Sequence, residues 1–447
     1  MQYISKCENW TVEQYPDNEE NCEYKLSDYA IVDSYLGGYI LFHTITWGFF
    51  FLTYDEYNNI LTNKFFIDNK IVISTSINET EIAEKVYNMR SNTIKDEYYK
   101  TLDTYVILTT NECNANCPYC YETLKVGSMS KSTADNLIKM IKEKHNNDVK
   151  ITWFGGEPLK NIPIIDYIVQ RLNEEEIPFT SDMISNGLLF TKDVVDKAVN
   201  SWNLKSVQIT IDGTEEQYNK IKNYDNFEGN AFKTVIDNIL YIRDNIDLEV
   251  NIRINISDEN IDYIEDLIKY LNENVVGNKV SFYMKLIYQI TSTPELAKKD
   301  NILDRYYDLM NKYFRGSKNL ILKKQKLSSC MADNCSAVAI LPNGTICNCE
   351  HCGTESYIGN INTTGFVDKE VIDAKINKMG DKLLFCKNAK CKLLPVCTKY
   401  DFCTPEKRCK TQDMCELENY KFSKLMKYTT DYYFYKLDKM KKEKGEG

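Results

Sequence analysis

Apolar and polar residues follow a regular pattern through the middle of the chain. Strand-like apolar runs begin at residues 104, 149, 179, 206, 248 and 279, so their starts lie 27 to 45 residues apart. Amphipathic, helix-like stretches separate them. This alternation predicts repeated β-α units around a parallel sheet. Six units are fewer than the eight of a complete barrel, so we expect an α/β fold with a partial (β/α)6 barrel over residues 104–290.

A different pattern precedes the barrel, in residues 1–95. The stretches "YILFHT" and "GFFFLTY" read as paired strands, and "FFIDNKIVIS" as a further strand or hairpin. The stretches "DEYNNILT" and "NETEIAEKVYNMRS" carry acidic first turns and helical spacing. The sequence therefore predicts a small, separate α+β domain at the N-terminal end.

The pattern weakens after the barrel. We expect a helical linker over residues 291–325, an irregular Cys-rich segment over residues 326–420, and a terminal helix with a solvated tail over residues 421–447. A segment with so little apolar periodicity buries little surface unaided. Metal ligation is a natural source of its order, because ligation energy is folding energy in such a domain.

Composition narrows the class of protein. A chain of 447 residues with 43% hydrophobic content and 9 prolines is globular and large enough for two or three domains. Its net charge of −10 argues against a nucleic-acid partner. We expect no membrane partner and a cytoplasmic protein, because we find neither a signal sequence nor an apolar run of membrane-spanning length. In that reducing compartment, 16 cysteines indicate metal or redox chemistry rather than disulfides.

The cysteines are unevenly distributed. Cys113, Cys117 and Cys120 lie within "NECNANCPYCYE", and eleven more lie between residues 330 and 415. Thiolates hold zinc or iron–sulfur clusters. A structural zinc site uses four ligands, so three closely spaced thiols leave one coordination position open. From the spacing alone, half of a zinc site remains the alternative.

Short polar and glycine motifs mark the ends of the predicted strands. "GGEP" begins at residue 155, "SNG" at residue 185 and "TIDG" at residue 210, and the three-cysteine motif follows the first strand. One such glycine or aspartate alone would be read as a turn. Ligands of parallel sheets bind at the carboxyl ends of the strands, so four motifs in register predict a binding site.

The C-x3-C-x2-C spacing, with Tyr119 before the last cysteine, resembles the signature of radical S-adenosylmethionine (SAM) enzymes. The resemblance implies a 4Fe–4S cluster on the three cysteines, with its open iron chelated by SAM. Reductive cleavage of SAM then gives a 5′-deoxyadenosyl radical that abstracts a hydrogen atom. The cofactor-binding residues that it implies are Tyr119, Gly155, Gly156, Glu157, Ser185, Asn186, Thr210, Lys222 and Arg253.

Two of the implied polar residues have alternatives. Lys222 stands where the family usually has an arginine, so it keeps the charge but not the two-pronged grip on a carboxylate. Asp212 is the catalytic candidate, as a proton acceptor or as a partner of a SAM hydroxyl. An aspartate before glycine at a strand end also caps turns, which is the alternative for this residue.

The C-terminal cysteines resemble a SPASM domain, which binds two auxiliary 4Fe–4S clusters. The resemblance implies one ligand set of Cys330, Cys335, Cys349 and Cys403, and another of Cys386, Cys391, Cys397 and Cys415. The spacings depart from the family pattern, and Cys347, Cys352 and Cys409 are surplus. One or two zinc sites are the alternative for this region.

The N-terminal domain resembles the winged-helix-like leader-recognition modules of peptide maturases, which bind a leader peptide at a sheet edge. We therefore expect an oxidoreductase that modifies a ribosomally synthesised, Cys-containing precursor peptide, forming a sulfur-to-carbon thioether. A flavodoxin or ferredoxin would supply electrons. The alternatives are a formylglycine-forming sulfatase maturase and a non-catalytic, zinc-stabilised peptide-binding protein. The peptide, the carbon attacked and the oligomeric state stay open.

Overall fold

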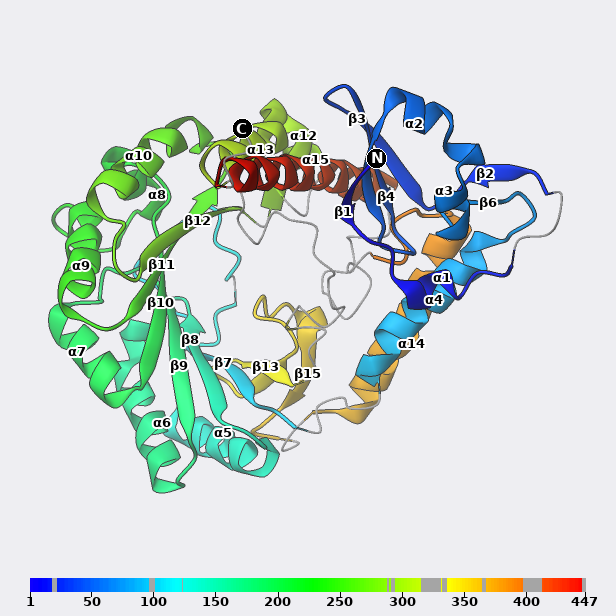
Figure 1. The fold of residues 1–447 in the computed structure, drawn as a ribbon. Helices are drawn as coiled ribbons and strands as arrows, with labels where there is room; N and C mark the ends of the chain where they lie inside the picture. Colours follow the sequence, from blue (N-terminus) through cyan, green and yellow to red (C-terminus); the bar gives the residue numbers. More distant parts are fainter. Residues whose placement is uncertain are drawn as a thin grey trace.

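The computed structural model describes residues 1–17, 22–95, 101–122, 124–287, 289–290, 294–314, 331, 336–363, 367–396 and 412–443. Within these ranges, side chains are not described at residues 90–95, 294, 355, 375–383, 385, 412–415 and 417. The statements below concern the described residues. A curved sheet with helices on its outer face forms one side of the molecule, and a smaller sheet forms the other (Figure 1).

Six neighbouring parallel strands form the core, as the sequence predicts. They are β7 (Thr104–Thr110), β8 (Val149–Gly155), β9 (Phe179–Ser185), β10 (Leu204–Thr210), β11 (Glu249–Ile256) and β12 (Val280–Leu286). Strands covered on both faces are expected to be continuously apolar. In β7, every residue after Thr104 is buried. The predicted core of parallel strands is confirmed.

Amphipathic helices cover the outer face of this sheet (Figure 1). They are α5 (Lys131–Lys144), α6 (Ile162–Glu174), α7 (Lys192–Ser201), α8 (Glu215–Lys222), α9 (Ala231–Asn245) and α10 (Ile264–Asn274), with short 3-10 turns η2 (Pro158–Asn161) and η3 (Ile261–Tyr263). The start of α5 illustrates the local cause: the Ser130 hydroxyl accepts from the Thr133 amide and caps the helix. Its apolar face, including Leu137 and Ile141, is fully buried in the core.

The Cys-rich segment adds strands to the same sheet. β13 (Ala337–Ile340) pairs in parallel with β7, and β14 (Thr345–Cys347) and β15 (Tyr357–Asn360) continue antiparallel, so the sheet has nine strands. The weak periodicity of this segment did not predict these short strands. Backbone pairing therefore joins the segment directly to the barrel.

The N-terminal domain contains two antiparallel sheets. The larger has β1 (Gln2–Ser5), β5 (Phe49–Thr53), β4 (Gly38–His43) and β3 (Ala30–Tyr35) in that order, and the smaller has β2 (Tyr24–Leu26) and β6 (Val72–Ser74). Its helical elements are α1 (Asn9–Val12), α2 (Tyr54–Asn58), η1 (Ile60–Thr62), α3 (Lys64–Asp68) and α4 (Glu79–Lys95). The predicted strand pair β4–β5 is confirmed.

One N-terminal element differs from the prediction. The start of "FFIDNKIVIS" forms helix α3 rather than a strand, and only its end forms β6. Asn63 caps the helix by accepting from the Phe65 amide, and Phe66 is fully buried. A capped turn that buries one aromatic face outweighs the β propensity of these residues.

The remaining helices lie after the barrel. They are α12 (Pro294–Lys298), η4 (Lys299–Asn301), α13 (Ile302–Tyr313), η7 (Thr354–Ser356), α14 (Lys369–Asn388) and α15 (Gln412–Glu443). Helix α15 crosses between the barrel and the N-terminal sheet (Figure 1). The domain boundary expected at residue 420/421 falls inside this helix. No helix in the described part of the chain is long and apolar enough to cross a membrane.

Candidate functional site

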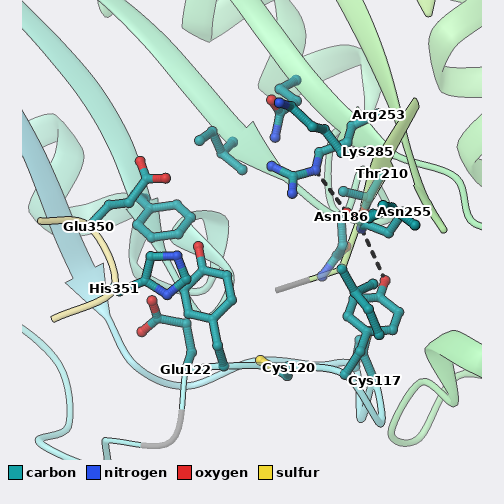
Figure 2. A pocket seen from close by; sticks show the side chains of 18 of the residues that line it. Cys117, Cys120, Glu122, Asn186, Thr210, Arg253, Asn255, Lys285, Glu350 and His351 are labelled. Carbon is teal, nitrogen blue, oxygen red and sulfur yellow. Dashed lines mark hydrogen bonds between the residues drawn. The ribbon is translucent and has the colours of Figure 1, made fainter. Parts of the chain in front are cut away.

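A cavity of about 540 Å³ lies at the carboxyl ends of the barrel strands. Eleven of the residues singled out in the sequence line it together: Cys113, Cys117, Tyr119, Cys120, Gly155, Gly156, Ser185, Asn186, Thr210, Lys222 and Arg253. Figure 2 shows several of these side chains converging on one space. Two further candidates, Glu157 and Asp212, are fully buried and do not line it. The fold therefore gathers the strand-end motifs, while the role of each residue stays a prediction.

The three cysteines lie on one loop after β7. Cys113 and Cys117 are half-buried and Cys120 is exposed. Burial raises the pKa of the Cys113 and Cys120 thiols. The loop is held by backbone bonds to the end of α8, where the Asn116 amide donates to the Lys222 carbonyl at 2.8 Å. A thiol loop fixed at the wall of a cavity is a suitable donor set for a soft metal centre.

The chemistry of this donor set fits an iron–sulfur cluster, because cysteine thiolates are the ligands of such clusters. In the described residues, no three Cys, His, Asp or Glu side chains are grouped closely enough to hold one metal ion. A four-iron cluster separates its thiolate ligands by its own iron–sulfur core. Three thiols spread along one cavity wall are compatible with that larger group.

Glycines bring the end of β8 against the start of the cysteine loop. Gly155 has φ +125°, and a Cβ there would lie 2.1 Å from the Thr110 carbonyl oxygen. A Cβ on Gly156 would lie 2.5 Å from the Glu112 carbonyl oxygen. Glycine alone meets both demands, because it lacks a Cβ and tolerates positive φ. The two glycines therefore let the end of β8 pack directly against the start of the cysteine loop, at the wall of the cavity that they line.

The buried Glu157 carboxylate positions Ser185 and Asn186 at the end of β9. It accepts from the Ser185 hydroxyl at 3.0 Å and from the Asn186 amide at 2.8 Å. Burial raises the Glu157 pKa to about 7, although these hydrogen bonds lower it. Asn186 in turn donates to the Asn114 side chain at 2.7 Å. Glu157 thus connects the third strand to the cysteine loop without reaching the cavity.

A buried ion pair forms part of the opposite wall, where Lys222 lines the cavity and Asp212 lies behind it. The Lys222 ammonium lies 2.8 Å from the Asp212 carboxylate, and their side chains are 2% and 0% exposed. The Tyr119 hydroxyl also donates to Asp212. Burial lowers the Lys222 pKa, but Asp212 outweighs this effect and the pKa stands well above its usual value. Lys222 is therefore charged at neutral pH.

The sequence analysis missed a group from the Cys-rich segment. Glu350 and His351, in the turn after β14, line the cavity beside Tyr121 and Glu122. The His351 ring lies 4.1 Å from the Tyr121 ring, so His351 packs against the aromatic wall of the cavity. Burial raises the Glu350 pKa, and burial together with Glu350 raises the Glu122 pKa to about 7. The position of Glu350 and His351 between two cysteines was the available signal.

Further lining residues come from the barrel interior and from two later helices. They are Ala115, Phe154, Ile184, Gln208, Asn255, Lys285, Leu286 and Ile287, then Leu303, Tyr306 and Tyr307 of α13, and Glu418, Lys421 and Leu425 of α15. Asn255 was recognisable because it lies two residues after Arg253, on the same face of β11. No local signal marked the helical residues.

The described C-terminal cysteines lie in two places. Cys349 is buried near the barrel interior, beside Cys347 and Cys352, which are also buried. Cys386 and Cys391 pack instead against the N-terminal domain. Of the predicted ligands, Cys330, Cys335, Cys397 and Cys403 lie outside the described residues, as does the side chain of Cys415. The described members of the two predicted ligand sets therefore lie in separate regions: Cys349 of the first set near the barrel, and Cys386 and Cys391 of the second against the N-terminal domain.

Comparison with known sequences identifies the core. Residues 107–271 match the family model described as the Radical SAM superfamily. The radical SAM cyclopropyl synthase TigE of Paramaledivibacter caminithermalis is 23% identical over 346 residues, which cover 70% of each chain. A GTP 3′,8-cyclase of Clostridium perfringens is 28% identical over 284 residues, covering 58% of this chain and 83% of the relative. Residues 107–271 are therefore similar to radical SAM domains.

Solved structures share the fold. Native anSMEcpe with bound AdoMet and the Cp18Cys peptide superposes with a TM-score of 0.55 at 18% identity. The superposition covers 75% of this chain and 99% of that structure. At this identity, the likeness supports the radical SAM fold alone.

Proposed function

We propose that this radical SAM protein is a peptide maturase that modifies a ribosomally synthesised precursor peptide. The observation that carries the proposal is the single cavity on which three thiols, the paired glycines and the strand-end polar groups converge. A non-catalytic, zinc-stabilised binding protein would need no such convergence. The cavity is also of the size that a cofactor and part of a substrate require.

The residues have distinct roles in this proposal. Cys113, Cys117 and Cys120 hold a 4Fe–4S cluster, and Gly155 and Gly156 let SAM approach the backbone. When bound, cluster and SAM together supply a hydrogen-atom abstractor. The ring of Tyr119 and the polar groups of the third and fourth strands orient the cofactor. The buried walls around them shield a reactive intermediate from side reactions.

The N-terminal domain binds the leader of the peptide. In the described residues, β3 pairs only with β4, so its other edge carries no strand and is the edge to which we assign an added strand. Helix α15 contacts β3 through Asp33, which accepts from the Ser423 hydroxyl and pairs with Lys427 at 3.1 Å. The same helix lines the cavity. A peptide held at β3 is therefore close to an element that reaches the reaction site.

A thioether from a peptide cysteine to a carbon atom is the product that we propose. Two auxiliary clusters on the C-terminal cysteines would bind the peptide thiolate or accept the electron left after bond formation, and a flavodoxin or ferredoxin would supply the electron that starts the reaction. The match to TigE favours a second candidate, carbon–carbon closure of a cyclopropyl ring, since it spans 70% of both chains. Formylglycine formation in a sulfatase is the third.

The test combines cofactor cleavage with peptide mass. Anaerobically reconstituted protein, with SAM and dithionite, should form 5′-deoxyadenosine, and a variant with all three loop cysteines changed to alanine should not. Equal formation by that variant would contradict the proposal. Cys-containing peptides encoded beside the gene should lose the mass of two hydrogen atoms. Loss of alkylation at the cysteine identifies a thioether, whereas a retained thiol identifies a cyclopropyl product.

A further inference from the structure

The side chain of Lys222 has no donor left for a ligand. A lysine ammonium has three N–H donors. In Lys222 these face the Asp212 carboxylate at 2.8 Å, the Thr210 hydroxyl at 2.7 Å and the Tyr119 hydroxyl at 3.1 Å. Binding an anion through this ammonium would break one of these buried contacts.

Asp212 is equally occupied. One carboxylate oxygen accepts from Lys222 and from the Tyr119 hydroxyl, and the other accepts from the Asn255 amide at 2.9 Å. Removing one partner of a buried pair is strongly destabilising, because it leaves an uncompensated charge. The pair therefore has a structural role. It holds Tyr119, Thr210 and Asn255, which all line the cavity.

Arg253 has donors to spare. A guanidinium has five N–H donors. Its Nε donates to the Asn255 side chain at 2.8 Å, and a further donor reaches the Tyr283 hydroxyl. The Arg253 side chain projects into the cavity (Figure 2), which it lines. A planar guanidinium matches the two oxygens of a carboxylate, whereas an ammonium acts as a point charge.

We propose that Arg253 binds the carboxylate of SAM and that Lys222 is a positioning residue, which holds Tyr119 and Thr210 in the cavity wall. This inference rests on the proposed function, because it assumes that SAM occupies the cavity. It reverses the assignment carried over from the family pattern, in which the residue at the position of Lys222 makes that contact.

The test compares SAM with decarboxylated SAM, each binding to the reconstituted protein without reductant. Arg253→Met should weaken SAM binding at least tenfold but decarboxylated SAM binding less than threefold, because only SAM has the carboxylate. Chelation by iron does not enter this comparison, since the variant leaves the cluster unchanged. Lys222→Met should weaken both ligands by the same factor and lower the melting temperature.

A double variant distinguishes an effect on ligand binding from an effect of misfolding. Asp212→Asn with Lys222→Met removes both charges of the pair, and should be more stable than Lys222→Met alone. Lys160→Met is the matched control, since Lys160 forms an exposed ion pair with Glu112 outside the cavity and should change neither affinity nor stability.

Two results would overturn the inference. One is a loss selective for SAM in Lys222→Met or in the double variant, and the other is an equal loss of both ligands in Arg253→Met. Failure of the proposed function is recognised separately, as wild-type protein that holds no iron or binds neither ligand.

Discussion

Gly155 and Gly127 both have positive φ, but they differ in what surrounds them. A Cβ on Gly155 would collide with the Thr110 carbonyl oxygen, whereas nothing lies within 4 Å of a Cβ on Gly127. Gly127→Ala should therefore cost about 1 kcal/mol, from backbone strain alone. Gly155→Ala should cost at least about 2–3 kcal/mol more, because the cysteine loop must also move. Urea unfolding of both variants measures the difference; equal losses would show that the close approach is not required.

His43 is a buried, neutral histidine in the N-terminal domain. Burial lowers its pKa to about 3, and its ring nitrogens contact the hydroxyls of Ser27 and Thr46, both at 2.8 Å. Near it, Glu79 bonds to Ser27, and burial raises the Glu79 pKa. The unfolded chain binds a proton to histidine below about pH 6.5, whereas the folded chain does not, so the histidine favours unfolding as pH falls.

The resulting pH prediction has a clear sign. From about pH 6.5 down to about pH 3, His43 should lower the free energy of unfolding by roughly 1.4 kcal/mol per pH unit. His43→Gln should remove this slope, and His145→Gln, in a half-buried loop position, should retain it. Because Glu79 is present in every variant, the difference between wild type and His43→Gln isolates the histidine. Chemical denaturation at a series of pH values is the measurement, and parallel slopes would contradict the prediction.

At the scale of elements, α15 connects the two sides of the molecule. Glu418, Lys421 and Leu425 line the cavity. On the other side, Met426 is fully buried against the N-terminal sheet, and the Phe422 ring lies 5.3 Å from the Phe42 ring. Deleting the N-terminal domain would therefore expose apolar surface of α15, so point variants test leader binding better than truncation.

Met426→Ala should destabilise the protein by about 2–5 kcal/mol, because it leaves a cavity between α15 and the N-terminal sheet. Met440 lies on the same helix but is 51% exposed, so Met440→Ala should change the free energy of unfolding by less than about 0.5 kcal/mol. Thermal unfolding and proteolysis between the domains measure both variants. Indistinguishable behaviour would mean that this contact does not hold the domains together.

At the scale of the whole molecule, the cavity is assembled from parts far apart in the sequence. The barrel contributes the cysteine loop and the strand ends, the segment after β13 contributes Glu350 and His351, and α13 and α15 close the side. Among the described C-terminal cysteines, Cys347 and Cys352 lie near the barrel interior, whereas Cys386 and Cys391 lie against the N-terminal domain. This distribution is compatible with two auxiliary clusters of different roles.

Iron content tests that arrangement. Three thiolate-held clusters predict about twelve irons per chain, and the triple alanine variant of the loop cysteines should retain about eight. Cys403→Ala, made in the wild-type background, should also reduce the iron content. It should abolish the peptide product if the cluster that Cys403 ligates binds the substrate. Iron and zinc analysis of anaerobically purified protein is the measurement. Zinc without iron, or full product without that cluster, would refute the respective assignment.

The sequence alone determined the parallel barrel and the position of its motifs. Strand length, helical periodicity and the strand-end motifs are local signals, and all six predicted strands formed. Local signals failed where packing decided the outcome, as at α3, where a buried aromatic side chain stabilised a helix.

Only the tertiary structure decided which side chains share the cavity and which stand behind its wall. Asp212 follows β10 and Lys222 ends α8, and folding brings their charges together in a buried pair. Glu350 and His351 enter the cavity because β13 pairs with β7, a contact between residues more than 200 positions apart. The sequence specifies which donor groups are present. Which of their atoms face the cavity depends on strand pairing between distant segments, and on hydrogen-bond and ion-pair partners that no local pattern reveals.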